Sequence, residues 1–448
     1  MTPFSGQRIA VMGLGRNGLA AARALRDLGA EVTAWDDGAA QRAAAEREGI
    51  TLRNTATARF DALVLSPGIP HTLPAPHPAA MRARELHAPI LSDAEFLFRA
   101  VRAAGSRARF AGVTGTNGKS TTTALLAHLL SKAGIANAAG GNLGPAALSL
   151  PVLGDDGVYV LEMSSYMLER IAGLAFDAAV MLNLSADHLD RHGDMAAYVA
   201  AKRAVFARQD ARDLAVLGDD DDATRAFADT LRSHPAPVLR VSGDHPADVW
   251  AEGRILCDGD GILADLAAAP ALPGSHNAQN AAAAGAMACF LGADRALLAD
   301  GFATYPGLPH RQQQVGTVSG ITFVNDSKAT NADSTARALA SYPRVVWIAG
   351  GIAKEGGIAA LAPFFPRVAQ VFLIGRDAEI LAATLKAHGV RHDIVGTLEQ
   401  AVPAAYAAAR AGAADTVLLS PACASFDQFT GYDARGDAFG ALVRGLPS

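Results

Sequence analysis

The sequence predicts an α/β protein whose sheets are mostly parallel. Apolar, β-rich runs recur along the chain, and each leads through a glycine-rich or polar turn into an Ala- and Leu-rich helical stretch. This alternation is typical of βαβ units, in which a helix returns the chain to the start of the next parallel strand. The chain has 448 residues, which exceeds the size of a single hydrophobic core, so we expect several domains.

The expected strands fall into three groups along the chain. They are residues 8–12 and 61–65, then 108–113, 157–162 and 178–182, then 344–349, 370–374 and 416–420. A new glycine-rich turn opens near Gly112, and a proline-containing segment lies at 305–311. These breaks predict domains at residues 1–97, 98–307 and 308–448. Ligands of such sheets bind beyond the carboxyl ends of strands, so we expect function in the turns that follow these runs.

The composition is that of an ordinary globular protein, with half of the residues apolar, 19% charged and no long low-complexity tract. The first residues do not resemble a signal peptide, and no apolar run reaches the roughly 18 residues of a membrane span. Three cysteines lack the short spacings of a metal site or a disulfide framework, and a net charge of −5 gives no general basic field for nucleic acid. We therefore expect a cytoplasmic protein that binds neither nucleic acid nor membranes, and we take a monomer as the default state.

Lysine is rare in this chain, with six residues among 39 basic ones. A lysine in a chain that favours arginine marks positions that need a compact ammonium or an amine that can lose its proton, because arginine offers neither. The six are Lys119, Lys132, Lys202, Lys328, Lys354 and Lys386.

The turn Gly13-Leu14-Gly15-Arg16-Asn17-Gly18 follows the first strand-like run and opens a helical stretch, and Asp36 ends the next strand-like segment. This pattern predicts a Rossmann-like domain, in which the turn approaches a diphosphate and the acidic residue contacts a ribose hydroxyl. The pattern alone fits NAD and other diphosphate-bearing nucleotides equally well. A purely structural turn is a third interpretation.

The segment TGTNGKST joins another strand-like run to a helical stretch and is typical of a phosphate loop. Its small residues allow backbone N–H groups to close around phosphate oxygens, and the helix N-terminus adds positive potential. Lys119 is placed to reach the terminal phosphates, and Ser120 or Thr121 to coordinate magnesium. The residue five before Gly118 is Val113 rather than glycine, which argues against a generic kinase or GTPase. The central domain is therefore expected to be a phosphate-loop ATPase-like fold.

Three further residues are candidates for metal binding. Glu162 ends a strand-like run where a magnesium ligand would face the phosphate loop, although an exposed glutamate at a strand end is the alternative. His188 lies in NLSADHLDRH, whose density of charges and imidazoles is more typical of a metal or nucleotide site than of a stabilising role. Lys202, in a helical segment, would by itself be interpreted as a solvated lysine.

The motifs TGTNGKST, LEMSS, NLSADHLDRH and a helix containing AAK occur in the order and rough spacing of Mur ligases. Three more follow, at 274–284 (GSHNAQNAAAA), 308–311 (LPHR) and 325–335 (NDSKATNADST). The chain thus resembles the Mur ligases over essentially its whole length. The segments NDSKATN and LLSPACASFDQF (418–429) are most similar to the D-glutamate-adding member of that family.

The resemblance implies a UDP-sugar site in the first domain, formed by Gly13 to Gly18, Asp36, Ser66 and Gly68, which decides against NAD. Asn142 would contact the muramoyl-alanine part. ATP would bind the phosphate loop and residues of the second and third domains. The implied ATP-binding residues are Gly115, Thr116, Asn117, Gly118, Lys119, Ser120, Thr121, Asn277, Asn280, Arg311, Asp326 and Lys328.

The resemblance also implies two magnesium ions, held by Ser120, Glu162, His188 and Lys202. In this family the lysine corresponding to Lys202 is carbamylated, which turns an ammonium into an anion that can approach magnesium. The resemblance implies that Glu162, His188 and Lys202 are catalytic residues, together with Lys119. Thr330, Lys354, Ser425, Phe426 and Tyr432 would hold glutamate.

The implied reaction is ATP-dependent ligation of D-glutamate to UDP-N-acetylmuramoyl-L-alanine through an acyl phosphate, with His310 and His188 as candidate bases for the incoming amine. The loop GGIAKEGG at 350–357 departs from many relatives, in which Gly and then Asp-Phe follow this lysine, so an L-glutamate-adding variant is a second interpretation. A folylpolyglutamate synthetase-like ligase is a third, although that enzyme lacks a separate nucleotide-sugar domain. An NAD-linked oxidoreductase would leave the phosphate loop unexplained, and a catalytically silent regulator would be expected to have lost these catalytic residues.

Overall fold

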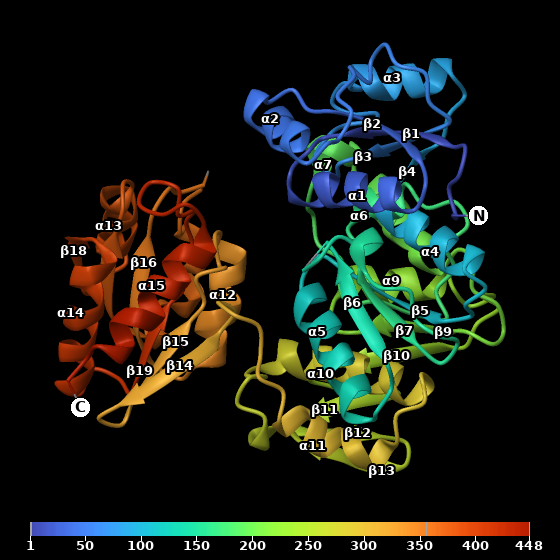
Figure 1. Cartoon of the computed structure of the whole chain (residues 1–448). Coiled ribbons are helices and arrows are strands. Elements are labelled where there is room, and N and C mark those ends of the chain that lie inside the picture. The colour runs from blue at the N-terminus through green and yellow to red at the C-terminus, as the bar shows by residue number, and fades with distance from the viewer. Residues whose placement is uncertain (1, 143, 355, 448) are drawn as a thin grey trace. The chain divides into compact units, whose positions relative to one another are not determined.

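The computed structural model describes residues 2–142, 144–354 and 356–447, and it confirms the predicted α/β class with mostly parallel sheets (Figure 1). The described strands form three sheets of four, nine and six strands. The chain divides into two compact units, one of residues 1–265 and 278–302, the other of residues 266–277 and 303–448. The first two sheets belong to the first unit and the third sheet to the second unit. The finer division into three domains stays a prediction.

The first sheet has the order β2-β1-β3-β4 and its described pairs are parallel. Its strands are β1 (Arg8–Met12), β2 (Glu31–Trp35), β3 (Ala62–Leu65) and β4 (Ile90–Leu91). The connecting helices are α1 (Arg16–Asp27), α2 (Ala39–Arg47), α3 (Pro78–Glu85) and α4 (Asp93–Ala103). The turn that follows β1 therefore opens directly into α1, as the glycine-rich pattern predicts.

The second sheet has the order β13-β12-β11-β10-β9-β8-β5-β7-β6 and is parallel except at its β11–β13 edge. Its strands are β5 (Arg109–Thr114), β6 (Asn137–Gly141), β7 (Val158–Glu162), β8 (Ala178–Met181), β9 (Leu214–Gly218), β10 (Val238–Ser242), β11 (Val249–Glu252), β12 (Ile255–Asp258) and β13 (Gly261–Asp265). The α-helices are α5 (Lys119–Lys132), α6 (Ser165–Leu168), α7 (Leu189–His192), α8 (Met195–Arg203), α9 (Asp222–Asp229), α10 (Ser275–Phe290) and α11 (Leu298–Ala303). Short 3-10 helices are η1 (Ala147–Ser149), η2 (Ala204–Phe206), η3 (Leu266–Ala268) and η4 (Arg295–Leu297).

The third sheet has the order β14-β15-β19-β16-β17-β18, and only β14 pairs antiparallel in the described part. Its strands are β14 (Gln313–Val318), β15 (Ile321–Asn325), β16 (Val345–Gly350), β17 (Val368–Ile374), β18 (His392–Gly396) and β19 (Thr416–Leu419). The helices are α12 (Ala332–Ser341), η5 (Ala359–Arg367), α13 (Ala378–Ala387), α14 (Leu398–Arg410) and α15 (Tyr432–Arg444).

Helices cover both faces of the parallel sheets, which explains why their central strands are mostly apolar. Every residue of β7, β8 and β16 is buried, and polar residues do not alternate with apolar ones along these strands. A strand packed on both faces gains hydrophobic free energy from consecutive residues rather than from every second one. Polar side chains therefore occur mainly at the strand ends, where the candidate site residues also lie.

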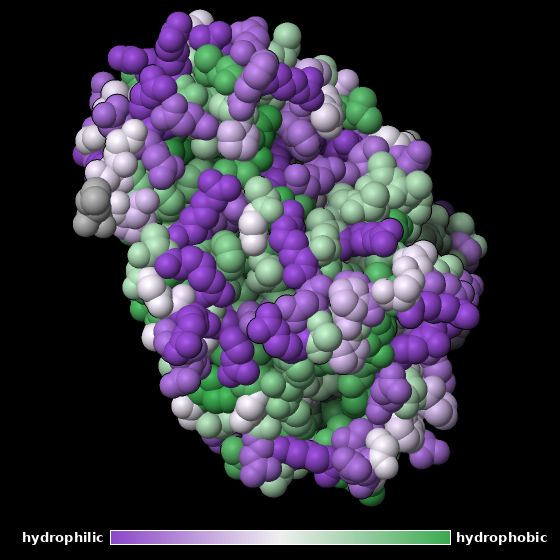
Figure 2. Space-filling model, turned by 90° about the vertical axis from the view of Figure 1, so that its right-hand side faces the viewer, coloured by the Kyte–Doolittle hydropathy of each residue, from purple (hydrophilic) through white to green (hydrophobic). Residues whose placement is uncertain are grey.

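No described helix is both long and apolar enough to cross a bilayer. Figure 2 shows hydrophilic residues spread over the visible face, with smaller apolar areas between them. Such a mixture is usual for a folded protein, because polar surface alone does not suffice to cover it.

A buried carboxylate joins α4 to the segment that follows α6. The side chain of Glu95 is almost fully buried, and its oxygens accept backbone N–H groups of Ala172, Gly173 and Leu174 at 2.9–3.0 Å. Arg99 donates a further hydrogen bond at 2.9 Å. Burial by itself would raise the pKa of Glu95, but these donors together hold it below its usual value.

Replacing Glu95 with glutamine should destabilise the first unit by about 2–3 kcal/mol at neutral pH, because the amide cannot accept all of these hydrogen bonds. Since the folded-state pKa of Glu95 is depressed, its contribution is present above the unfolded pKa and is lost as pH falls through the folded pKa. The difference in unfolding midpoint between wild type and Glu95→Gln should therefore shrink below about pH 4. Urea unfolding across pH measures this difference.

The matched control is Glu85→Gln, which changes an exposed glutamate of α3 that pairs with Arg82. That substitution should shift the midpoint little, because exposed ion pairs contribute under about 1 kcal/mol. Equal shifts for the two variants would contradict the role given to Glu95.

Candidate active site

The phosphate loop lies where β5 ends and α5 begins. Gly115 and Gly118 have φ angles of 146° and 84°, which residues with side chains rarely adopt. A Cβ atom at Gly118 would lie 2.4 Å from Oδ1 of Asn280, so the loop packs directly against α10. The structure thus places Asn280, one of the predicted ATP-binding residues, beside the loop.

Two lysine side chains converge on one carbonyl oxygen of this loop. Nζ of Lys119 donates to the carbonyl oxygens of Gly115 at 2.9 Å and Thr116 at 2.8 Å. Nζ of Lys202, from α8, donates to the same oxygen of Gly115 at 2.8 Å. Lys202 is only 1% exposed, so it is not a solvated helix lysine.

The environment of Lys202 favours its neutral form. Burial and the positive charge of Lys119 lower the pKa of Lys202 well below its usual value, while the carboxylates of Asp187 and Glu162 act in the opposite direction. A lysine with a lowered pKa has a larger fraction of free amine, which is the form that reacts with carbon dioxide.

Glu162 is buried at the carboxyl end of β7 and has one unsatisfied oxygen. β7 pairs with β5 in a register that sets Glu162 opposite Val113, just before the phosphate loop. Its Oε1 accepts the side-chain amide of Asn142 at 2.7 Å, and its Oε2 has no hydrogen-bond partner among the described residues. A buried carboxylate oxygen without a donor is costly, and a divalent cation would satisfy it.

His188 follows β8, in a segment that is hydrogen-bonded to the phosphate loop. Asn183 of this segment accepts N–H groups from Thr116 at 2.9 Å and from Asn117 at 2.8 Å. His188 has a left-handed φ of 54°, and its ring centroid lies 5.0 Å from that of Tyr166. Its side chain is 48% exposed, and its Nε2 lies 3.3 Å from a carboxylate oxygen of Asp187. A non-glycine residue with positive φ is uncommon and often occurs at functional sites.

The turn after β1, Asp36 and Ser66 come together at the edge of the first sheet. Asp36 accepts the backbone N–H of Leu14 at 2.6 Å, and Ser66 donates its hydroxyl to the carbonyl oxygen of Gly13 at 3.0 Å. A Cβ atom at Gly18 would lie 1.8 Å from that carbonyl oxygen, so α1 packs against its own entry turn. The exposed Gly68 follows Ser66 in the same segment.

The same turn contacts the end of β6, where Asn142 lies. The side chain of Asn17 donates to the carbonyl oxygen of Gly141 at 3.4 Å, and Arg16 donates to that of Gly144 at 3.3 Å. All residues predicted to hold the UDP-sugar therefore lie in the first unit, and one of them, Asn142, contacts Glu162.

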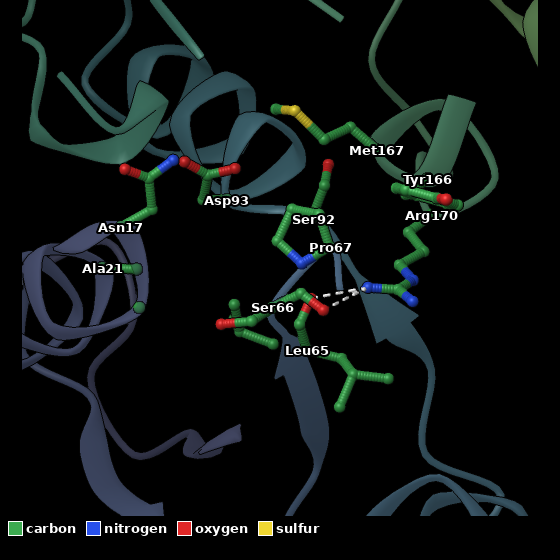
Figure 3. Close-up of a pocket in the computed structure, with 12 residues that line it drawn as sticks. Asn17, Ala21, Leu65, Ser66, Pro67, Ser92, Asp93, Tyr166, Met167 and Arg170 are labelled. Atoms are coloured by element: carbon green, nitrogen blue, oxygen red, sulfur yellow. Dashed lines mark hydrogen bonds between the residues drawn. The ribbon is translucent and has the colours of Figure 1, made fainter. Parts of the chain in front are cut away.

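Arg170 was not singled out in the sequence, yet it holds the turn that contains Ser66. Its guanidinium is buried and donates to the carbonyl oxygens of Leu65 at 2.6 Å, Ser66 at 3.2 Å and Ile69 at 2.9 Å. Figure 3 shows this contact beside a pocket that is also lined by Asn17. Burial lowers the pKa of Arg170 to about 10, so the group keeps its charge at neutral pH. No motif contains Arg170, so its role is visible only in the folded chain.

The residues predicted to hold glutamate gather at one edge of the third sheet. They are Thr330 after β15, Lys354 after β16, Ser425 and Phe426 after β19, and Tyr432 at the start of α15. β15, β19 and β16 are neighbours in the sheet, so their carboxyl ends lie side by side. Ile352 and Ala424 exchange backbone hydrogen bonds of 2.8 and 2.9 Å, which ties the loop of Lys354 to that of Ser425. Phe426 is 72% exposed, and such an open apolar ring is available to a ligand.

The predicted ATP-binding residues Asp326 and Lys328 lie at the same edge. Asp326 is buried and accepts the hydroxyl of Ser420 at 2.8 Å, and burial raises the pKa of Asp326 to about 7. Nζ of Lys328 lies 3.9 Å from the ring centroid of Tyr432, which is close enough for a cation–π interaction.

The remaining predicted ATP-binding residues lie on two other segments. Asn277 is on α10, like Asn280, and donates its side-chain amide to the carbonyl oxygen of Pro273 at 2.8 Å. Arg311 follows His310 in the segment that leads into β14. The candidate base His310 has a left-handed φ of 61°, and its Nδ1 lies 3.1 Å from Nδ2 of Asn325.

Known families match most of this chain. Residues 113–288 match the Mur ligase middle domain, and residues 310–423 match the Mur ligase glutamate ligase domain. The chain is 49% identical to UDP-N-acetylmuramoylalanine–D-glutamate ligase of Paramagnetospirillum magneticum, over 98% of this chain and 97% of that protein. It is 46% identical to the enzyme of the same name from Caulobacter vibrioides, over 99% and 97% of the two chains.

The chain belongs to the Mur ligase family. The predicted resemblance is thereby confirmed, and these two relatives carry the name of the D-glutamate-adding member. Residues 3–76 of this Mur ligase also match the NADPH-binding domain of acetohydroxy acid isomeroreductase. That match covers only the N-terminal part of the chain, whereas the relatives that align over nearly the full length are ligases, so the oxidoreductase interpretation is not favoured.

Solved structures agree with the fold. UDP-N-acetylmuramate–alanine ligase from Thermotoga maritima has a TM-score of 0.62 at 18% identity, over 98% of this Mur ligase and 99% of that chain. Folylpolyglutamate synthase from Mycobacterium tuberculosis has a TM-score of 0.57 at 17% identity, over 78% of this chain and 95% of that chain. At these identities the likeness shows the architecture alone.

Replacing Arg170 with methionine should destabilise the first unit by about 2–3 kcal/mol, because three backbone carbonyls would lose charged donors in a buried setting. The measurement is the midpoint of urea unfolding. Arg208→Met is the control, since Arg208 is exposed and makes one long hydrogen bond, of 3.4 Å, to the carbonyl oxygen of Ile171. If both variants unfold at the wild-type midpoint, the guanidinium does not hold this turn.

Proposed function

We propose that this Mur ligase joins D-glutamate to UDP-N-acetylmuramoyl-L-alanine, with conversion of ATP to ADP and phosphate. Relatives named UDP-N-acetylmuramoylalanine–D-glutamate ligase align with nearly the whole chain at 46–49% identity. The structural observation that supports the proposal best is the cluster of Lys119, Lys202 and Glu162 side chains at the phosphate loop. There, two lysines share the carbonyl oxygen of Gly115, and the carboxylate of Glu162 lies at the end of the neighbouring strand.

The reaction has two steps. The alanine carboxylate attacks the γ-phosphoryl group of ATP, the bond to ADP breaks, and an acyl phosphate forms. The amine of D-glutamate then attacks the acyl carbon, inorganic phosphate leaves, and the amine loses a proton. The first step brings two anions together, so it requires positive charge at the transferring oxygens.

Lys119 is suited to supply part of that charge. Its Nζ now donates to two backbone carbonyls of the phosphate loop, both within reach of the phosphates that the loop would hold. The N-terminus of α5 adds its positive end at the same place. Lys119 would orient and neutralise the γ-phosphoryl group in the first step.

The donor set fits divalent cations once Lys202 is modified. Ser120, Glu162, His188 and carbamylated Lys202 would hold two magnesium ions, whose chemistry is to neutralise charge on the phosphoryl oxygens. The unsatisfied Oε2 of Glu162 supports this assignment. A protonated Lys202 would repel a cation, whereas the lowered pKa of this lysine favours the amine that carbon dioxide carbamylates.

The third-sheet edge would hold D-glutamate. The ammonium of Lys354 suits the side-chain carboxylate of the substrate, and Thr330 and Ser425 offer hydroxyl groups. Phe426 and Tyr432 would close the sides of the pocket. This assignment rests on the resemblance and on the gathering of these residues at adjacent strand ends.

The central test measures phosphate release from ATP and magnesium with purified protein, UDP-N-acetylmuramoyl-L-alanine and either enantiomer of glutamate, with omission controls and product mass. We expect release and a glutamyl product with D-glutamate alone. Product with L-glutamate alone would keep the chemistry but overturn the stereochemistry. No turnover with either enantiomer would overturn the proposed function.

Replacing Lys119 with methionine should lower kcat by about 10²–10³-fold, the usual cost of losing one donor to developing charge. Lys132→Met is the matched control, because Lys132 ends the same helix α5 and pairs with Asp300 at 2.7 Å. Its kcat should equal that of wild type. Similar kcat values for both variants would exclude a catalytic role for Lys119.

A further inference from the structure

A buried arginine of α15 connects the loops at the glutamate edge of the third sheet. Arg435 is 0% exposed. Its Nε donates to the hydroxyl of Ser327 at 3.0 Å, and its Nη2 donates to the carbonyl oxygens of Ser327 at 2.9 Å and Cys423 at 3.1 Å. Nη1 donates to the carbonyl oxygen of Gly350 at 3.4 Å. One guanidinium therefore contacts three separate segments of the chain.

Those segments follow three adjacent strands. Ser327 comes after β15, Cys423 after β19 and Gly350 at the end of β16, and the sheet order is β15-β19-β16. Each segment also carries residues that the resemblance assigns to a substrate. Lys328 and Thr330 follow Ser327, Lys354 follows Gly350, and Ser425 and Phe426 follow Cys423. The atoms held by Arg435 thus lie within a few residues of the predicted pocket.

The helix that carries Arg435 is itself fixed to the same loops. The hydroxyl of Ser327 donates to the carbonyl oxygen of Tyr432 at 2.7 Å, and Nδ2 of Asn325 donates to that of Gly436 at 2.8 Å. Tyr432, a predicted glutamate contact, lies one helical turn before Arg435. A shift of the guanidinium would therefore move Tyr432 together with the three loops.

Arg435 bears a charge that no carboxylate pairs with directly in the described part of the chain. Its guanidinium donates to backbone carbonyl oxygens and to one hydroxyl. Burial lowers the pKa of Arg435 to about 10, so the group stays protonated at neutral pH. A cation buried among carbonyls is retained only if its hydrogen bonds offset the cost of desolvation. Its positive potential also favours anions at this sheet edge, where a dicarboxylate is proposed to bind.

We propose that Arg435 is a positioning residue for the amino-acid substrate: by holding Ser327, Gly350 and Cys423, it sets the spacing of the loops that contact glutamate. This inference rests on the proposed function. Arg435 has no exposed surface and does not itself touch substrate, so it acts through Lys354, Ser425 and Tyr432. A lysine at this position would keep the charge but not the planar fork that reaches three segments at once.

The test compares Arg435→Lys with wild type in the ligation assay. We expect the KM for D-glutamate to rise about 10-fold or more, because small displacements of contact groups weaken binding strongly. The KM for UDP-N-acetylmuramoyl-L-alanine should stay within about twofold, since its predicted contacts lie in the first unit. Arg444→Lys is the control, as Arg444 is exposed at the end of the same helix, and it should match wild type.

A loss of general stability would not produce this selective change in KM, so the two substrates distinguish positioning from a merely structural role. If Arg435→Lys folds, as judged by its unfolding midpoint, and its KM for D-glutamate stays within about twofold of wild type, the proposal is overturned. An equal rise in both KM values would overturn it as well.

If Arg435→Lys does not fold, Ser327→Ala decides the question. This variant removes the hydroxyl that accepts from Nε of Arg435 and that donates to the carbonyl oxygen of Tyr432, and it leaves the backbone carbonyl acceptors of Arg435 in place. We expect a rise of about threefold in the KM for D-glutamate, and an unchanged KM would contradict the proposal. Wild type is assayed alongside, and its failure to turn over would refute the proposed function instead.

Discussion

Parallel strands end at a common edge, and every candidate site of this protein depends on that constraint. Because helices cover both faces of the sheets, the strands themselves are apolar and buried, and polar groups gather where the strands stop. β5 leads into the phosphate loop, β7 ends in Glu162, and β8 leads to His188. Residues far apart in the sequence become neighbours because their strands pair, as Val113 and Glu162 do.

Close approach of backbone segments is the second requirement. A Cβ atom at Gly118 would collide with Asn280, and one at Gly18 would collide with the carbonyl oxygen of Gly13. Glycine at these positions lets a helix start directly against a turn, so that backbone N–H groups of the turn and the helix end can face a phosphate. Gly118 thus allows contact with a side chain of α10, and Gly18 allows contact with the backbone of its own entry turn.

Buried cations complete the sites by holding loop carbonyls. Lys202 reaches the phosphate loop, Arg170 the turn after β3, and Arg435 the loops after β15, β16 and β19. A loop at a strand end has backbone carbonyls that the sheet no longer pairs, and a long cationic side chain satisfies them from a distance. The residue types suit these contacts. Lys202 can lose its proton, whereas the planar guanidinium groups of Arg170 and Arg435 donate to several acceptors at once.

The sequence alone determined the α/β class, the two glycine-rich turns and the membership of the family, because these features are local in the chain and are written in apolar periodicity and motif spacing. The motifs also predicted roles for Lys119 and Glu162, and the resemblance added Lys202, which by itself would be interpreted as a solvated lysine. Only the tertiary structure decided what those groups meet and which residues outside the motifs hold them. Arg170 and Arg435 lie in no motif, and their partners are separated from them by up to 108 positions in the sequence. Contacts of that kind arise from strand pairing and helix packing, which a reading of neighbouring residues does not contain.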